Sequence, residues 1–186
     1  MQIKDQSADV VAFWRDAGPK KWFAHDATFD AEIRAKFEPL HLTASTGALG
    51  SWGGAAQGAL ALLILVDQFP RNMYRGSAHA FATDPLARSI AASATSRDLH
   101  LQLDPDLRGF IYLPYSHSER LEDQDQAVAL CRAHLEATGD AGLLKWANLH
   151  RDIIARFGRF PHRNACLGRI TTPEEQAFLD AGGFAG

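Results

Sequence analysis

The sequence predicts an all-α fold, an array of about eight or nine helices packed as antiparallel hairpins. Apolar residues recur at helical spacing through most of the 186-residue chain. Capping residues, glycines and prolines divide these segments at short intervals. Alternating β-branched runs bounded by hairpin turns, which would indicate strands, do not occur. We therefore expect one helical domain over residues 1–186, long enough to bury roughly 70% of the unfolded surface.

Helix boundaries in the first half follow from caps, glycine and proline. A first helix should begin near Ser7 and end before Gly18. Thr28 is expected to cap the second helix. The most apolar helix should begin at Ser51 and continue up to Pro70, which stops it because proline lacks the backbone N–H.

The second half repeats these signals. Asp84 and Asp104 each precede a proline, which is typical of an N-cap followed by a first-turn proline. The helix after Asp104 should end or kink at Pro114. Ser116 and Glu119 have capping-box spacing, which predicts a long helix that ends near residue 139. A helix over residues 143–158 and a short last helix, opened by residues 172 and 175, complete the array.

Composition and charge exclude several classes of protein. Hydrophobic residues make up 46% of the chain, as in an ordinary globular protein. The formal net charge is -3, whereas a dedicated nucleic-acid binder is expected to be basic. Cys131 and Cys166 are far apart and lack metal-ligand spacing, so we predict neither a disulfide nor a zinc site, and a reducing cytoplasm is the expected location. We also predict no cofactor. The longest apolar run, residues 59–66, is far below the ~20 residues of a membrane span. No signal-peptide core is present at the N-terminus.

Three helices each place a polar residue on an apolar face. Asp67 follows Leu63 and Ile64 by about one helical turn, so its carboxylate needs a buried cation or several hydrogen bonds. His150 and Gln124 lie within the apolar stripes of their helices. The arginines available to Asp67 are Arg71, Arg75, Arg159 and Arg163. Each polar residue has two interpretations, a satisfied structural group or part of a polar pocket.

Two loops carry further polar groups. Tyr115, His117 and Glu119 surround a predicted helix start, where backbone N–H groups favour an anion. The densest donor cluster follows the helix at 143–158, and arginine forks suit carboxylate or phosphate. This cluster consists of Arg159, His162, Arg163 and Asn164. A salt-bridge hub is the structural alternative for this loop.

A short internal similarity links two of these segments. The residues Gln68-Phe69-Pro70-Arg71-Asn72 and Arg159-Phe160-Pro161-His162-Arg163-Asn164 both follow a strongly apolar helix. Each segment places proline, arginine and asparagine just after a helix end. Two interpretations stay open, convergence on helix-ending chemistry and two similar corners of one site. We predict that Asp67 and residues 159–164 meet in one site that selects an anion, with Arg71, Asn72, His117 and Glu119 beside it.

The chain resembles a bacterial family of domains of unknown function, number 924 in that series. The resemblance is carried by residues 67–72, 110–119 and 150–164, and it extends from Phe13-Trp14 to Thr172 and Glu175. It implies an all-helical fold similar to tetratricopeptide hairpin arrays, although no 34-residue repeat is visible. It implies no particular activity.

These observations leave several functions open. The first is a binding module whose polar pocket takes an anionic small molecule or a peptide carboxylate through Arg71, Tyr115, Gln124 and the loop at 159–164. The alternative is a hydrolase-like enzyme with His117, His150 or Glu119 as acid and base, although no nucleophile motif is present. The sequence contains no H-E-x-x-H motif, so we predict that the protein binds no metal. RNA binding by the basic residues 156–169 is least favoured, and the oligomeric state stays open.

Overall fold

The computed structural model describes residues 6–185, in which all regular secondary structure is helical and no strand occurs. The chain divides into two compact units. The first unit comprises residues up to 75 together with residues 79–114. The second comprises residues 76–78 and the chain from residue 115 onward. The predicted all-α class is confirmed, while the prediction of one domain stays a prediction.

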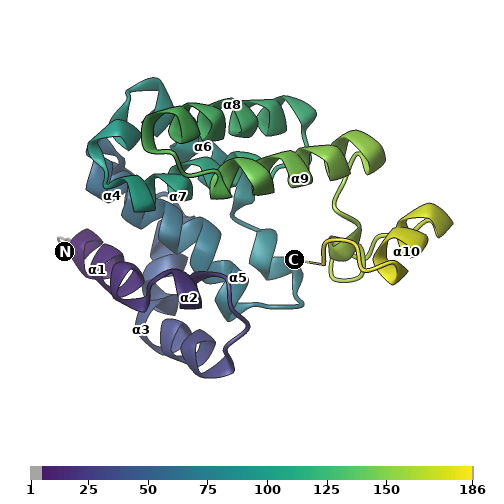
Figure 1. Ribbon diagram of the computed structural model, residues 1–186. Coiled ribbons are helices and arrows are strands. Elements are labelled where there is room, and N and C mark those ends of the chain that lie inside the picture. The colour runs from purple at the N-terminus through teal and green to yellow at the C-terminus, as the bar shows by residue number, and fades with distance from the viewer. Residues whose placement is uncertain (1–5, 186) are drawn as a thin grey trace. The chain divides into compact units, whose positions relative to one another are not determined.

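The first unit contains the helices coloured from purple to teal in Figure 1. Its α-helices are α1 (Ser7–Ala17), α2 (Pro19–Trp22), α3 (Ala27–Ser45), α4 (Ala56–Leu63), α5 (Phe69–Met73), α6 (Asp84–Ser96) and most of α7 (Pro105–Ser116). Short 3-10 segments lie between them: η1 (Gly50–Gly54), η3 (Ala78–Phe81, whose first residue belongs to the second unit) and η4 (Leu99–Gln102). A π-helical turn, η2 (Ile64–Gln68), joins α4 to α5.

Aromatic rings form the centre of the first unit. Trp14 of α1 is fully buried, and its ring centroid lies 5.6 Å from those of Phe69 and Phe110. Phe29 of α3 stacks on the same indole at 6.2 Å. Such edge-to-face and stacked pairs add to the stabilisation from area burial alone. Every residue from 58 to 70 is buried, which confirms the predicted buried helix in this region.

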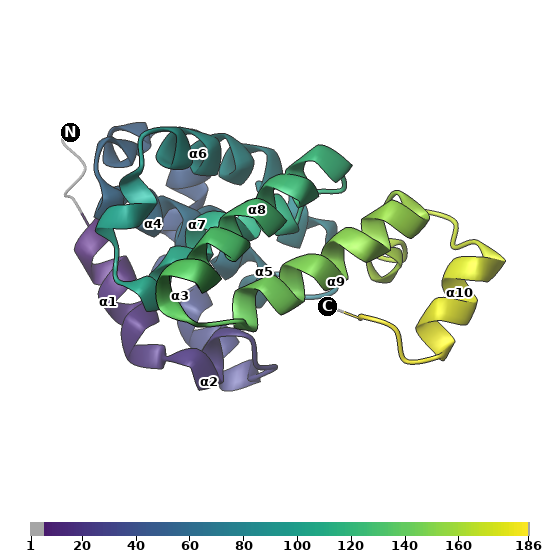
Figure 2. The same cartoon turned by 45° about the horizontal axis from the view of Figure 1, so that its top comes forward.

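The second unit is built on a helical hairpin. Helices α8 (Leu121–Thr138) and α9 (Gly142–Phe157) lie side by side and antiparallel in Figures 1 and 2. The 3-10 turn η5 (Pro161–Arg163) and helix α10 (Pro173–Asp180) follow. The capping box predicted for the last helix is confirmed, since Thr172 and Glu175 exchange side-chain and backbone hydrogen bonds. Similarity to tetratricopeptide arrays stays a prediction.

Some predicted helix starts are wrong by a few residues. Asp26, rather than Thr28, caps α3 and accepts from two backbone N–H groups. The capping box at Ser116 and Glu119 does not form, because α7 passes through Pro114 and ends at Ser116. Helix α8 therefore begins later, at Leu121. The region before Pro70 is likewise more irregular than one helix, with a 3-10 turn, α4 and the π-helical turn in succession.

Candidate functional site

The second unit brings together four of the predicted site residues, which we call the His150 cluster: His117, His150, His162 and Arg163. Helix α9 supplies His150, the turn after α7 supplies His117, and η5 supplies the other two. The rings of His117 and His150 lie 6.5 Å apart. The sequence predicted a cation-rich loop after α9, and the fold of this unit adds two histidines to it.

Two phenylalanines pack against the cluster. The ring of buried Phe160 meets His150 edge to face at 5.5 Å and lies 5.6 Å from His162. Phe184 lies 4.7 Å from His150 and 5.2 Å from His162. The guanidinium of Arg163 is 4.4 Å from the centre of the Phe160 ring, in cation–π range. The cluster is therefore positive in character and bordered by aromatic rings.

His150 is the unusual member of this cluster. It is 7% exposed, and neither ring nitrogen has a hydrogen-bond partner among residues 6–185. Burial above all, together with the nearby His117 and Arg163, lowers the pKa of His150 to about 3, while the Ser116 backbone opposes this shift. The ring is therefore neutral near pH 7. Its inward position was predicted, but its lack of a partner was not.

The turn that carries His117 is held through its carbonyl groups. The Gln124 amide donates to the Ser116 oxygen at 2.9 Å and to the Ser118 oxygen at 2.6 Å. Arg163 donates to the His117 oxygen at 3.0 Å. Gln124 is fully buried, so the partners that the sequence required for it are backbone carbonyls. Among the residues described, its own amide oxygen has no partner.

Glu119 is a structural acceptor in this fold. Arg169 donates to both of its carboxylate oxygens, at 2.8 and 2.9 Å, and the Phe160 N–H donates at 2.9 Å. Burial alone would raise the pKa of Glu119, but the Arg169 and Phe160 hydrogen bonds outweigh it and lower the pKa. This carboxylate connects the turn before α8 to the segment around η5. No pattern in the sequence predicted that Glu119 would pair with Arg169.

Arg159 and Asn164 meet at a second carboxylate, that of Glu175. Arg159 binds it with two nitrogens at 2.6 and 2.8 Å, and the Asn164 amide donates at 3.1 Å. The Thr172 N–H adds a further bond at 2.7 Å. These hydrogen bonds, the Arg159 pair above all, lower the pKa of Glu175 to about 2. Arg159 is therefore engaged in an ion pair within this unit, while the predicted salt-bridge hub to Asp67 and helix C-termini stays a prediction.

Tyr115 is the remaining predicted site residue of the second unit. It stands near the C-terminal end of α7, and its side chain is buried. Its predicted role in ligand binding stays a prediction.

The other predicted residues, Asp67, Arg71 and Asn72, lie in the first unit. Asp67 is 1% exposed and pairs with Arg71 at 3.3 Å. Arg71 also pairs with Asp84 at 3.0 Å, and the Asn72 amide donates to Asp30 at 2.7 Å. Arg71, four residues further along the chain, is thus one cation that pairs with buried Asp67. The predicted joining of this site with residues 159–164 stays a prediction.

The π-helical turn beside Asp67 has its carbonyl groups satisfied by side chains. In the π register residue 70 would donate to the Leu65 oxygen, but Pro70 has no N–H. His41 bonds the Leu65 oxygen at 2.8 Å, and Thr83 donates to the Val66 oxygen at 2.5 Å. Arg71 donates to the Asp67 oxygen at 2.6 Å. The similar corners that the sequence suggested therefore share one feature, an arginine that holds a turn carbonyl.

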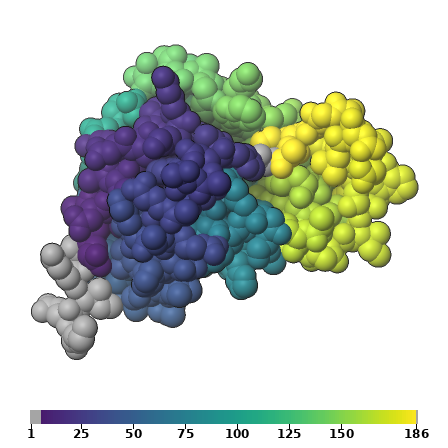
Figure 3. Space-filling view, turned by 90° about the horizontal axis from the view of Figure 1, so that it is seen from below, coloured from purple at the N-terminus to yellow at the C-terminus, as the bar shows by residue number. Residues whose placement is uncertain are grey.

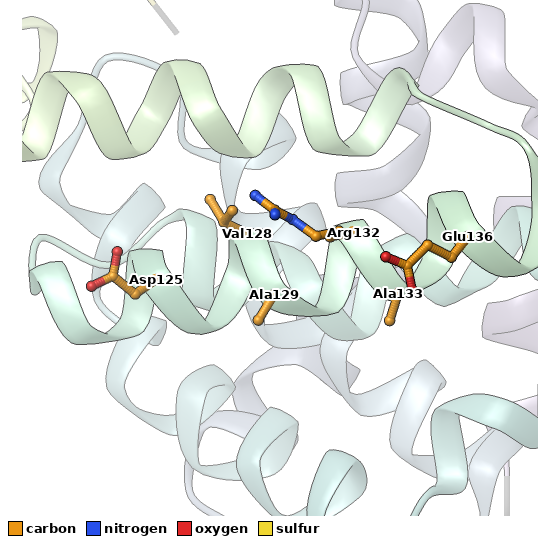
Figure 4. Close-up of a pocket in the computed structure, with 6 residues that line it drawn as sticks. All are labelled: Asp125, Val128, Ala129, Arg132, Ala133 and Glu136. Carbon is orange, nitrogen blue, oxygen red and sulfur yellow. The ribbon is translucent and has the colours of Figure 1, made fainter.

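A shallow surface hollow lies elsewhere, on the exposed side of α8. It has a volume of about 370 Å³, and Figure 4 shows the side chains that line it, Asp125, Val128, Ala129, Arg132, Ala133 and Glu136. The buried face of the same helix carries Gln124 and Cys131 instead. The hollow contains none of the predicted site residues. No group of three potential metal ligands occurs within residues 6–185.

The basic segment considered for RNA binding is largely paired with acids. Arg156 pairs with Glu174 at 3.0 Å, and Arg159 and Arg169 bind their own carboxylates. These pairs reduce the positive potential that phosphates would require. In the part of the chain that is described, no helix is both long enough and apolar enough to cross a bilayer.

Comparison with known proteins decides the family. A family model described as a bacterial protein of unknown function, DUF924, matches residues 10–183. This chain belongs to the DUF924 family. A solved structure of a protein of unknown function from Agrobacterium tumefaciens is similar to this DUF924 protein, with a TM-score of 0.89 and 46% identity, over 96% of this chain and 100% of that one. No curated protein matches the chain.

Proposed function

We propose that this DUF924 protein is a binding module whose His150 cluster takes up a small anion or the carboxylate of a peptide. One observation carries the proposal: His150 is buried, and its ring nitrogens have no hydrogen-bond partner among the described residues. A buried polar group left unpaired costs roughly 1–3 kcal/mol. A bound anion would accept a hydrogen bond from the ring and remove this cost.

The charges around His150 support a negative ligand. Arg163 is a permanent positive charge near His150, and His117 and His162 add positive charge when they are protonated. The carboxylates of Glu119 and Glu175 are each paired with an arginine, so they do little to cancel this positive potential. An anion bound to His150 would also be attracted by the Arg163 guanidinium, and charge-assisted hydrogen bonds are about twice as strong as neutral ones.

The proposal does not require the rest of the predicted pocket. Participation of Tyr115 and of the first-unit residues Asp67, Arg71 and Asn72 remains part of the wider hypothesis. The hydrolase alternative has less support, because Glu119 is committed to Arg169. The cytoplasm is the proposed location.

The test is a titration of inorganic phosphate and acetate, followed by the imidazole resonances in NMR spectra and by calorimetry. We expect saturable binding that shifts the His150 ring signals. His150→Leu, which preserves volume and removes both ring nitrogens, should weaken binding about tenfold or more, the effect of losing one charge-assisted hydrogen bond.

His41→Leu is the matched control. His41 is as deeply buried as His150, but its Nδ1 already bonds the Leu65 oxygen. This variant should lose stability and retain anion binding. Unchanged binding in His150→Leu, or no saturable binding of any anion by the wild-type protein, would refute the proposed function.

A further inference from the structure

An exposed tryptophan stands on α9 next to the His150 cluster. Trp146 precedes His150 by four residues, which places both on one side of the helix, and 51% of the tryptophan is exposed. The Lys145 ammonium lies 5.9 Å from the centre of the Trp146 ring. Tryptophan is among the residues most enriched at binding surfaces, because it offers a large apolar ring with little loss of entropy on binding.

Phe184 connects this tryptophan to the buried histidine. Its ring centroid is 6.4 Å from that of Trp146 and 4.7 Å from that of His150. Phe184 is only partly buried. Figure 3 shows the C-terminal segment, in yellow, packed at the surface against the yellow-green residues that precede it. A row of aromatic rings therefore extends from the exposed Trp146 to the buried His150.

Two glycines set the position of Phe184. Gly182 has φ of 77°, a left-handed conformation that favours glycine, and its N–H donates to the Leu179 oxygen. Gly183 donates to the Phe178 oxygen, and a Cβ at this position would lie 2.6 Å from that same oxygen. A side chain is thus excluded at residue 183. The turn after α10 therefore places the Phe184 ring against His150 and His162.

We propose that the anion is an aromatic carboxylate, with its carboxylate at His150 and Arg163 and its ring against Phe184 and Trp146. This inference rests on the anion-binding function proposed above and adds the class of ligand. A planar ring buries apolar surface against the two side chains, as in most small-molecule sites. Inorganic phosphate carries a negative charge but has no apolar part to bury against these two rings.

The test compares benzoate with acetate, which carries the same carboxylate without the ring. Benzoate should bind the wild-type protein at least about tenfold more tightly, because partial burial of a phenyl ring is worth a factor of this order. Cyclohexanecarboxylate, which is apolar but not planar, should bind with intermediate affinity. Calorimetry at constant pH and salt gives all three constants.

Trp146→Ala tests where the ring lies. Because Trp146 is half exposed, the variant should stay folded, and its preference for benzoate over acetate should fall several-fold while acetate affinity stays unchanged. Phe184→Ala should reduce the preference in the same way. The matched control is Phe23→Ala, which removes a 65% exposed ring of the first unit and should leave both affinities unchanged.

The outcomes separate the two proposals. If acetate and benzoate bind with equal affinity, or if Trp146→Ala keeps the wild-type preference, the ligand-class inference is overturned and anion binding stands. If neither benzoate, acetate nor phosphate binds, the proposed function fails as well. A preference for benzoate that depends on Trp146 supports both.

Discussion

At the residue scale, His41 and His150 are buried to a similar degree but differ in the groups that surround their rings. Both have a pKa lowered by burial. The Leu65 carbonyl and Glu38 partly offset this effect at His41, so its neutral ring also has a structural role. Around His150 the charged neighbours lower the pKa further than burial does by itself, and only the Ser116 backbone opposes them. His150 is therefore the residue whose environment least resembles that of a satisfied core histidine.

This environment predicts a pH-dependent stability. The pKa of His150 is about 3 in the folded chain and about 6.5 when unfolded, so between these values only the unfolded chain binds the proton. Stability from this residue is fully present above about pH 6.5 and is lost as the pH falls, by at most ~1.4 kcal/mol per unit. We expect the free energy of unfolding, measured with urea, to fall between pH 7.5 and pH 5. This fall should be smaller in His150→Leu than in the wild-type protein. Equal losses would contradict the assignment.

At the scale of elements, the π-helical turn η2 depends on donors from other helices. Pro70 removes one backbone donor, and side chains of α3 and of the segment before α6 take its place. A single π-helical turn of this kind is uncommon and is often found at functional sites. It persists here because tertiary contacts satisfy the carbonyl groups that regular helix geometry leaves unpaired.

Replacement of Thr83 tests this dependence. Thr83→Val keeps the shape of the side chain and removes the hydroxyl that donates to the Val66 oxygen, so a buried carbonyl loses its partner. We expect a loss of roughly 1–3 kcal/mol in the free energy of unfolding, measured by urea denaturation. Thr43→Val is the control, because the Thr43 hydroxyl bonds the Pro39 oxygen on an exposed helix face, and it should cost less than about 0.5 kcal/mol. Equal effects would argue against a special role for the turn.

At the scale of the whole molecule, ion pairs can be followed inside each of the two units. In the first unit Arg71 and Arg75 bind the carboxylates of Asp67, Asp84 and Asp30. In the second, Glu119 and Glu175 connect the turn before α8, the η5 segment and α10. The net charge of -3 therefore conceals local pairing that the composition does not reveal.

The prediction of one domain has a direct test in cooperativity. In the Trp146→Phe variant the three remaining tryptophans, at positions 14, 22 and 52, all lie in the first unit. Tryptophan fluorescence of this variant therefore reports the unfolding of the first unit. Hydrogen exchange of peptides from α8 and α9 follows the second unit. One domain requires the same urea midpoint by both probes, as expected for two-state unfolding. Two distinct midpoints would show that the units unfold independently.

Local signals in the sequence were sufficient for the helical class, for several helix ends and for the direction of key side chains. The start at Ser7, the end near Gly139 and the Thr172–Glu175 capping box depend on contacts within a few residues, so they could be predicted. Helical spacing likewise placed Asp67 and His150 inward. A periodic pattern determines which side of a helix is buried, but it does not say what lies opposite.

The partners of these side chains were decided by tertiary packing alone. Glu175 was recognisable from the sequence as a cap, yet its binding of Arg159 and Asn164 depends on how α10 returns to the segment after α9. The contact of Phe184 with His150 spans thirty-four positions and depends on the turn at Gly182 and Gly183. Pairings of this kind have no local signal, because their energy appears only when distant segments are already packed together.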